Sequence, residues 1–356
     1  MKTSFLDKMS DVLGNVANKI NNLRYIMVIK NAFTQLIPVI ITGAFGTLFS
    51  AMVFDSTNGL AKIKALSFLA DLKPIASSVS YVTLSFLTIY AVFLIGIELA
   101  KLNNISGAFA GIIAVMSYLS VNPTTYEFLD GDRSLLVENV LAKQYSDTKG
   151  LFLGMFIAIV SIELYSWLRK QDKLKIKMPD SVPSNVSVSF SSLIPTIFTV
   201  AIIAVFGFAV KAITGMYAYD IIYNVVQKPL EHIVQGLPGL LILMLIAQIF
   251  WVIGIHGNQM IKPIREPLLL AAIAVNTEAF EAGKEVPNII TMPFWDMYMS
   301  MGGSGVTIGL LIAIFLVGKR EDMKEIAKLS AAPGIFNINE PVIFGMPIML
   351  NPILAI

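Results

Sequence analysis

In the stretch GIFNINEPVIFGMPIMLNPILAI, Gly334–Ile356, Asn337, Asn339 and Glu340 lie just before Pro341 within a run that is mostly apolar. A carboxylate that faces lipid costs roughly 2.5–3.5 kcal/mol on insertion scales, so Glu340 is predicted to face a cavity or a polar partner. Pro341 has no N–H and favours the first turn of a helix, which predicts a non-helical approach through Asn339 and a new helix start. Irregular backbone at membrane depth is tolerated only where protein buries it or water reaches it, so this stretch is a candidate functional site.

The composition of the whole chain predicts a polytopic membrane protein. Of its 356 residues, 56% are hydrophobic and 14% are charged, which is too apolar for an ordinary soluble domain. The formal net charge is +2, so nucleic acid is not an expected partner. The chain has no Cys and two His, which excludes disulfides, thiolate metal sites and a phosphocysteine on this chain. We expect neither a metal nor a cofactor.

Apolar segments predict an all-α membrane protein with helices near residues 33–54, 80–100, 105–121, 151–168, 190–213 and 238–254, and with a charge-free segment at 301–318. Basic clusters at 169–177 and 319–328 follow two of these segments and mark the cytoplasmic side.

Two further features divide the chain. Between Asp220 and Gln235 the apolar residues fall on one helical face, which predicts an amphipathic helix that lies in the membrane interface. Pro183 and Ser184 suggest a boundary between an N-terminal half, 1–183, for scaffold and dimerisation, and a substrate-binding half, 184–356. Because the chain ends in an apolar run at Ile356, we expect further sequence beyond it.

A second interrupted region, WVIGIHGNQMIKPIREP at Trp251–Pro267, holds two glycines, two prolines and three charged residues. These residue types end or break helices. The apolar piece that follows, Leu268–Val275, is too short to cross a bilayer of about 30 Å, which needs about 20 residues. We therefore predict that this region is partly re-entrant.

The two interrupted regions hold the residue types of a carbohydrate site: Trp251, His256 and Asn258 in one, and Asn337, Asn339 and Glu340 in the other. An aromatic face stacks on the apolar face of a pyranose, while amides and a carboxylate bond its hydroxyls. Glu340 is also a candidate to take a proton from a sugar hydroxyl as that hydroxyl attacks phosphorus.

Plainer interpretations of the same residues stay open. His256 lies between two glycines and fits a helix end, Asn339-Glu340-Pro341 fits a helix cap, and Trp251 fits ordinary packing. The stretch Gly302-Gly303-Ser304-Gly305 lacks the Lys-Ser/Thr of a phosphate-binding loop and favours small-residue helix packing.

Three motifs carry a resemblance to a known family: WVIGIHG at 251–257, NINEPVIFG at 337–345, and Leu36-Ile37-Pro38. With them the chain resembles the membrane subunit, enzyme IIC, of the bacterial phosphoenolpyruvate-dependent sugar phosphotransferase system, in its lactose/cellobiose/diacetylchitobiose branch. The resemblance spans nearly the whole chain, and NINEPVIFG is its most specific part.

The resemblance implies a homodimer in the bacterial cell membrane, with re-entrant hairpins that hold a β-linked disaccharide. It implies that Glu340 and His256 contact the sugar near its 6-hydroxyl. A separate IIB protein, itself supplied by IIA, would deliver phosphate from a phosphocysteine, so the transferase activity would be completed by a partner. Two other functions stay open: an ion-coupled secondary transporter, in which Glu340 and His256 serve as a proton relay, and a membrane scaffold without transport.

Overall fold

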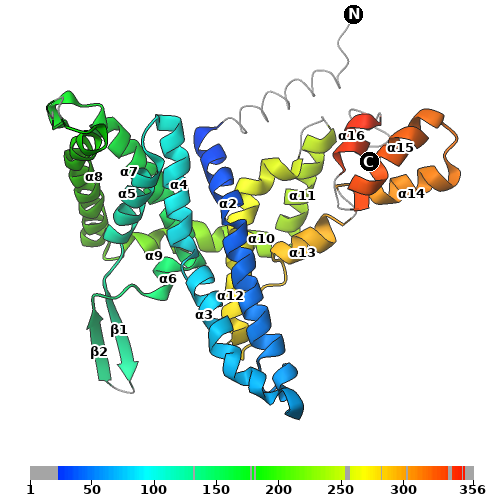
Figure 1. Ribbon diagram of the computed structural model, residues 1–356, viewed down its shortest axis with the longest axis horizontal. Coiled ribbons are helices and arrows are strands. Elements are labelled where there is room, and N and C mark those ends of the chain that lie inside the picture. The colour runs from blue at the N-terminus through cyan, green and yellow to red at the C-terminus, as the bar shows by residue number, and fades with distance from the viewer. Residues whose placement is uncertain are drawn as a thin grey trace, which may run out of the picture. The chain divides into compact units, whose positions relative to one another are not determined.

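The computed structural model describes residues 23–130, 133–176, 179, 182–252, 257–281, 283–301, 304–335, 339–346 and 348. The described chain is helical apart from one β-hairpin (Figure 1). Its contacts form two compact units: Val28–Pro229, and Leu230–Ile356 together with the described residues before Val28. The proposed functional boundary after residue 183 stays a prediction; helix α8 beyond it packs on α5 and α7 of the first unit.

The first unit consists of helices joined by short helical turns and one hairpin. Its main elements are α2 (Arg24–Leu48), α3 (Lys73–Leu84), α4 (Leu87–Asn103), α5 (Gly107–Ser120), β1 (Thr125–Asp130), β2 (Arg133–Glu138), α6 (Lys143–Ser146), α7 (Leu151–Arg169), α8 (Ser184–Thr214) and α9 (Ala218–Ile222).

The second unit carries both interrupted regions. Its elements are α10 (Lys228–Gln235), α11 (Leu237–Val252), α12 (Gly257–Glu281), α13 (Met292–Phe294), a π-helical segment (Trp295–Met299), α14 (Thr307–Val317), α15 (Glu321–Ile335) and α16 (Glu340–Gly345).

Three helical stretches in the described chain are long and apolar enough to cross a membrane: Arg24–Val53, Thr148–Arg169 and Ser189–Thr214. They confirm the spans predicted at 33–54, 151–168 and 190–213. Two bent pairs raise the number of possible spans to five. In one of these pairs Lys64–Leu84 meets Leu87–Asn103 at 41°. The segments at 105–121 and 301–318 form only shorter apolar helices, α5 and α14.

The predicted amphipathic helix is confirmed as part of the helical stretch Ala218–Gln235. This stretch meets α11 at 85°, so the chain turns by nearly a right angle. An interfacial helix followed by a membrane-crossing one requires such a turn. At this corner Gly239 has no room for a side chain, because a Cβ there would lie 1.9 Å from the Ile233 carbonyl oxygen.

Helix α12 corrects one prediction. The prolines of WVIGIHGNQMIKPIREP were expected to break any helix, but α12 begins at Gly257 and continues through Pro263 and Pro267. The residues from Leu268 to Ala272 are buried, at 0–7% exposed, so tertiary packing holds the helix despite the two missing N–H groups. Leu268–Val275 is therefore an inner part of a longer helix rather than a short segment by itself.

Close helix packing in the first unit depends on glycine. Helices α4, α5 and α7 lie side by side (Figure 1), and a Cβ on Gly96 of α4 would lie 2.9 Å from the Cα of Gly111 on α5. In lipid the hydrophobic effect does not drive helices together, so close backbone approach between small residues supplies the packing energy.

Replacing Gly111 with alanine is expected to destabilise the protein by about 1–3 kcal/mol through overpacking. The new Cβ would lie 2.6 Å from the Phe93 ring and 2.9 Å from the Phe93 carbonyl oxygen, and this clash exceeds the gain of about 1 kcal/mol in helix propensity. Gly107→Ala on the same helix is the control, since its Cβ would meet Ile97 at an ordinary 3.4 Å. Thermal unfolding in detergent compares them; equal midpoints would contradict the packing argument.

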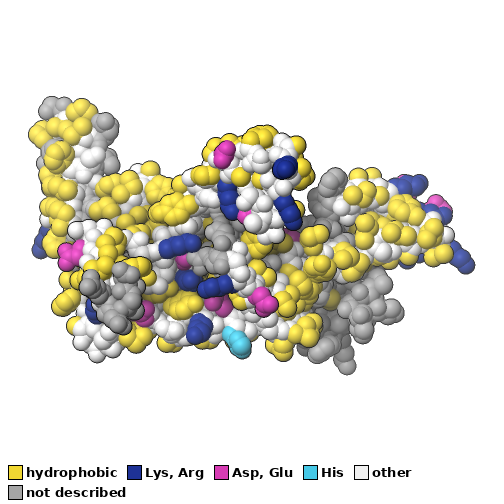
Figure 2. Space-filling model, turned by 90° about the horizontal axis from the view of Figure 1, so that it is seen from below, with side chains coloured by type: hydrophobic (Ala, Val, Ile, Leu, Met, Phe, Trp, Pro, Cys, Tyr) yellow, Lys and Arg dark blue, Asp and Glu magenta, His cyan; other side chains and the backbone are white. Residues whose placement is uncertain are grey.

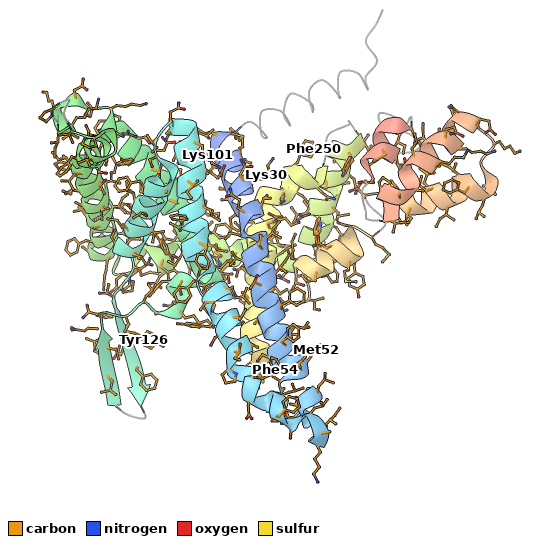
Figure 3. The ribbon with its side chains drawn as sticks, in the orientation of Figure 1. Lys30, Met52, Phe54, Lys101, Tyr126 and Phe250 are labelled. Atoms are coloured by element: carbon orange, nitrogen blue, oxygen red, sulfur yellow. The ribbon has the colours of Figure 1, made fainter. Side chains whose placement is uncertain are left out.

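A buried carboxylate joins α2 to α4. Glu98 is 6% exposed and accepts hydrogen bonds from Gln35 Nε2 at 2.7 Å and from Asn31 Nδ2 at 3.4 Å. It also forms an ion pair with Lys101. Lys30 and Lys101 lie at the same end of this helix pair, and Met52 and Phe54 lie toward the other end (Figure 3). The two lysines fit the positive-inside rule if this end is cytoplasmic.

The polar loop predicted at 122–149 contains a β-hairpin that was not predicted. Strands β1 and β2 pair antiparallel, with Tyr126 opposite Val137 and Phe128 opposite Leu135. These side chains are exposed, and Tyr126 lies on the hairpin where it extends from the helices (Figure 3). On the face that Figure 2 shows, hydrophobic side chains cover much of the described surface and charged ones form small groups.

Candidate functional site

The two interrupted regions meet at Ser304. Asn258, in the first turn of α12, donates from Nδ2 to Ser304 Oγ at 3.0 Å. Asn339, directly before α16, donates from Nδ2 to the Ser304 backbone oxygen at 3.1 Å. Ser304 and Asn339 are 5% and 4% exposed, so this junction is buried. Two predicted site residues, distant in sequence, therefore bind one small residue between them.

The start of α16 confirms the predicted helix start. Asn339 precedes the helix, Glu340 is its first residue and Pro341 lies in the first turn. The backbone N–H groups of Val342 and Ile343 bond to the Asn339 carbonyl oxygen at 3.1 and 3.0 Å. The Asn339 side chain makes no capping hydrogen bond and binds residue 304 instead, so a helix cap alone does not describe it.

Packing behind α16 fixes its position. Val342 on α16 and Met346 directly after it are buried against Leu311 of α14 and Ala327 of α15, in one apolar cluster. Helices α14, α15 and α16 lie together in Figure 1. The polar end of α16 is thus held from one side by apolar packing and at its start by the Asn339 hydrogen bond.

The start of α12 is set by a close backbone approach. A Cβ on Gly257 would lie 1.8 Å from the Ala247 carbonyl oxygen of α11, so only glycine fits there. Helices α11 and α12 pack on each other. Trp251 at the end of α11 is 3% exposed, and Asn258 follows Gly257 directly. Gly257 therefore determines how closely α12, which carries Asn258, approaches α11, which carries Trp251.

A cavity of about 430 Å³ lies beside this junction, within the range of about 300–1,000 Å³ typical of small-molecule sites. Its wall includes Trp251 and Ser304, and its other polar side chains are Gln248, Tyr298 and Thr307. The remaining wall is Met244, Val252, Met299, Met301, Gly305, Val306, Leu310, Ile343 and Ile348. An aromatic wall with three hydroxyls and one amide suits a neutral, hydroxyl-rich ligand.

Three of the predicted site residues can be placed in the structure. Trp251 lines the cavity, and Asn258 and Asn339 are hydrogen-bonded to Ser304 beside it. His256 and Asn337 lie outside the described residues, and so does the side chain of Glu340, although its backbone begins α16. The predicted contacts of these three residues with a sugar stay predictions.

Sequence reasoning missed Ser304, Gln248 and Tyr298. Ser304 was assigned to small-residue helix packing, but it accepts both asparagine hydrogen bonds. The signal that could have found it is a lone hydroxyl among glycines directly before an apolar helix. Gln248 is a polar residue within the apolar helix α11, and such residues face a cavity or a partner by default.

Comparisons with known proteins agree on one family. The family described as "Phosphotransferase system, EIIC" matches residues 30–356. The PTS system oligo-beta-mannoside-specific EIIC component of Bacillus subtilis (strain 168) is 35% identical over 351 residues, which cover 98% of this chain and 77% of that protein. The PTS system cellobiose-specific EIIC component of Geobacillus stearothermophilus is 30% identical over 360 residues, covering 98% and 78%. The crystal structure of the transporter ChbC, the IIC component from the N,N'-diacetylchitobiose-specific phosphotransferase system, superimposes with a TM-score of 0.88 at 30% identity, covering 99% of this chain and 80% of that one.

Proposed function

The chain belongs to the EIIC family of the phosphotransferase system, and from this premise we propose that it binds a β-linked disaccharide and translocates it with phosphorylation of the sugar 6-hydroxyl by a phosphocysteine IIB partner. As a member of this family it is a multi-pass sugar permease of a bacterial membrane that works with a IIB protein.

The observation that carries the proposal is the Ser304 junction beside the 430 Å³ cavity. The junction joins both predicted polar regions, and Trp251 lies in the wall of the cavity beside it. A pyranose presents an apolar face and a rim of hydroxyls, which match the Trp251 indole and the Gln248 amide in the cavity wall. The printed names of the relatives, which mention oligo-β-mannoside, lichenan and cellobiose, support a β-linked sugar.

In the proposed reaction the sugar O6 forms a bond to phosphorus, and the phosphorus–sulfur bond of the IIB phosphocysteine breaks. Sulfur leaves as a thiolate, and the hydroxyl proton passes to Glu340. His256 and Asn337 contact the sugar beside it. The protein's contribution is positioning and proton acceptance, because phosphoryl transfer needs little covalent help from its surroundings. The product is an anion, which cannot return across the membrane.

We also propose a homodimer, in which residues 1–183 provide scaffold and dimer contacts and 184–356 bind substrate. The four site residues described, Trp251, Asn258, Ser304 and Asn339, all fall in the second part. A IIA protein would recharge IIB.

Uptake into vesicles that contain the protein tests the function. We expect a β-disaccharide to accumulate as its 6-phosphate only when phosphorylated IIB is inside the vesicle, and a proton ionophore to leave this unchanged. A panel of labelled cellobiose, lactose, diacetylchitobiose and an α-linked control identifies the substrate. Accumulation of unmodified sugar that the ionophore abolishes would instead establish an ion-coupled transporter, with Glu340 as a proton carrier.

A further inference from the structure

Helix α12 contacts one wall of the cavity at two points. At one point Asn258 donates from Nδ2 to Ser304 Oγ at 3.0 Å. At the other, the guanidinium carbon of Arg265 lies 4.7 Å from the centre of the Trp295 ring. Asn258 and Arg265 are seven residues apart, two helical turns or about 10 Å along the axis, so they lie on the same face of α12. Between the two contacted residues the chain supplies three members of the cavity wall: Tyr298, Met299 and Met301.

The contact between Arg265 and Trp295 is buried. Arg265 is 6% exposed and Trp295 is 0% exposed. Within the described part of the chain, neither Arg265 Nε nor Trp295 Nε1 has a hydrogen-bond partner. A guanidinium within about 6 Å of the centre of an indole is attracted to the face of the ring, most strongly where water is excluded. The cation–π contact, and not a hydrogen bond from the indole N–H, therefore fixes the Trp295 ring.

Trp295 is the first residue of the π-helical segment Trp295–Met299. The backbone N–H of Ser300 bonds to the Trp295 carbonyl oxygen at 3.0 Å and closes this turn. Turns of this kind are rare and often occur at functional sites. Tyr298, within the turn, lines the cavity and packs its ring against Phe294, with 5.0 Å between the ring centres. Because Trp295 is buried where the turn begins, its position determines where Tyr298 lies.

Resting on the function proposed above, we infer that Arg265 is a positioning residue of the sugar site, which acts through Trp295 to hold Tyr298 against the bound sugar. Tyr298 is 66% exposed, so most of its side chain is available to a ligand. It gives the cavity a second aromatic residue besides Trp251, on a different element. Two aromatic side chains on separate elements suit a disaccharide, which has two rings with apolar faces.

Charge balance is the alternative role for Arg265, which interacts electrostatically with Glu266 and Asp296. Glu266 also forms an ion pair with Lys262 at 3.3 Å, and Asp296 is exposed. Neither carboxylate is therefore left buried without a cation when Arg265 is replaced, and Arg265→Met should still fold. Arg265→Lys separates the two roles, because lysine keeps the charge but lacks the planar group that stacks on an indole.

The experiment measures disaccharide affinity of the full chain in detergent. We expect Arg265→Met and Tyr298→Ala each to weaken binding about tenfold, the order of one lost aromatic contact. The double variant should also lose only about tenfold, since without Arg265 the tyrosine no longer contacts the sugar. Arg265→Lys should bind no better than Arg265→Met. Gln248→Ala, on α11, is the comparison, and its loss should multiply with that of Arg265→Met. Arg320→Met, at an exposed ion pair, is the matched control and should change nothing.

A second measurement does not depend on sugar binding. The chain has no Cys, so Met299→Cys places a single thiol in the cavity wall. A small polar methanethiosulfonate reagent should label this thiol at least about threefold faster when Arg265→Met is added, because the turn is no longer held. Saturating disaccharide should slow the labelling of Met299→Cys when Arg265 is present.

Three results would contradict the inference. They are a double variant whose loss equals the product of the two single losses, wild-type affinity in Arg265→Lys, and a labelling rate at position 299 that Arg265→Met leaves unchanged. The second result would mean that Arg265 only balances its neighbouring carboxylates. If wild type binds no disaccharide, the proposed function fails, while the labelling rate still decides whether Arg265 positions this wall of the cavity.

Discussion

Replacing Glu340 with glutamine is expected to slow IIB-dependent sugar phosphorylation by about 100- to 10,000-fold, the usual contribution of a general base. Glutamine keeps the size and hydrogen-bonding capacity of the side chain but cannot accept a proton. The sugar hydroxyl would then attack phosphorus without losing its proton to the protein. Because the backbone of Glu340 begins α16 and Pro341 follows, the helix start should survive the substitution.

Single-turnover phosphorylation in vesicles, together with disaccharide binding in detergent, measures this effect. Binding is expected to weaken much less than transfer, since an amide still bonds a hydroxyl. Glu325→Gln, on the exposed face of α15, is the matched control and should leave both unchanged. Normal phosphorylation by the Glu340→Gln variant would show that Glu340 takes no part in the phosphoryl transfer. If the variant instead loses proton-driven uptake, the protein is an ion-coupled transporter and Glu340 is its proton carrier.

Replacing Gly257 with alanine is expected to lower disaccharide affinity at least about 100-fold, the order of loss that a misplacement of about 1 Å can cause. The added Cβ would lie 1.8 Å from the Ala247 carbonyl oxygen and 2.6 Å from its carbon, so backbone atoms must separate. Overpacking of this kind also costs about 1–3 kcal/mol of stability. Helices α11 and α12 would move apart and carry Trp251 and Asn258 with them.

Gly309→Ala is the control for this substitution, because a Cβ on Gly309 of α14 meets nothing within 4 Å. Sugar binding and thermal unfolding of both variants in detergent complete the test. If Gly257→Ala binds sugar like wild type, the close approach of α11 and α12 does not position the site. A lower unfolding midpoint with unchanged sugar affinity would show that Gly257 contributes to stability but not to sugar binding.

Features that depend on local composition could be predicted from the sequence. Long apolar runs predicted the spans near 33–54, 151–168 and 190–213, since lipid forces backbone hydrogen bonds into helices. The one-sided apolar pattern predicted the helix at 220–235, and the position of Pro341 predicted the start of α16. In each case the physical cause lies within about twenty residues of chain.

Features that depend on tertiary contacts could not be predicted in this way. Helix α12 continues past two prolines, which usually break a helix, because the burial of Leu268–Ala272 stabilises it. The hairpin after α5 lies in a segment whose sequence indicates only a polar loop. Ser304 acquires its role only because α12 and α16 bring Asn258 and Asn339 to it. A lone hydroxyl among glycines marks Ser304 as unusual, but its binding partners depend on tertiary contacts.

The two hydrogen bonds at residue 304 differ in whether they require a serine side chain there. Asn258 binds the serine hydroxyl, whereas Asn339 binds a main-chain oxygen that every amino acid supplies. Replacing Ser304 with alanine would therefore remove the hydrogen bond to α12, while the hydrogen bond from Asn339 could still form. The link to α16 is encoded entirely at codon 339, so tolerance at one codon carries no information about the other half of the junction.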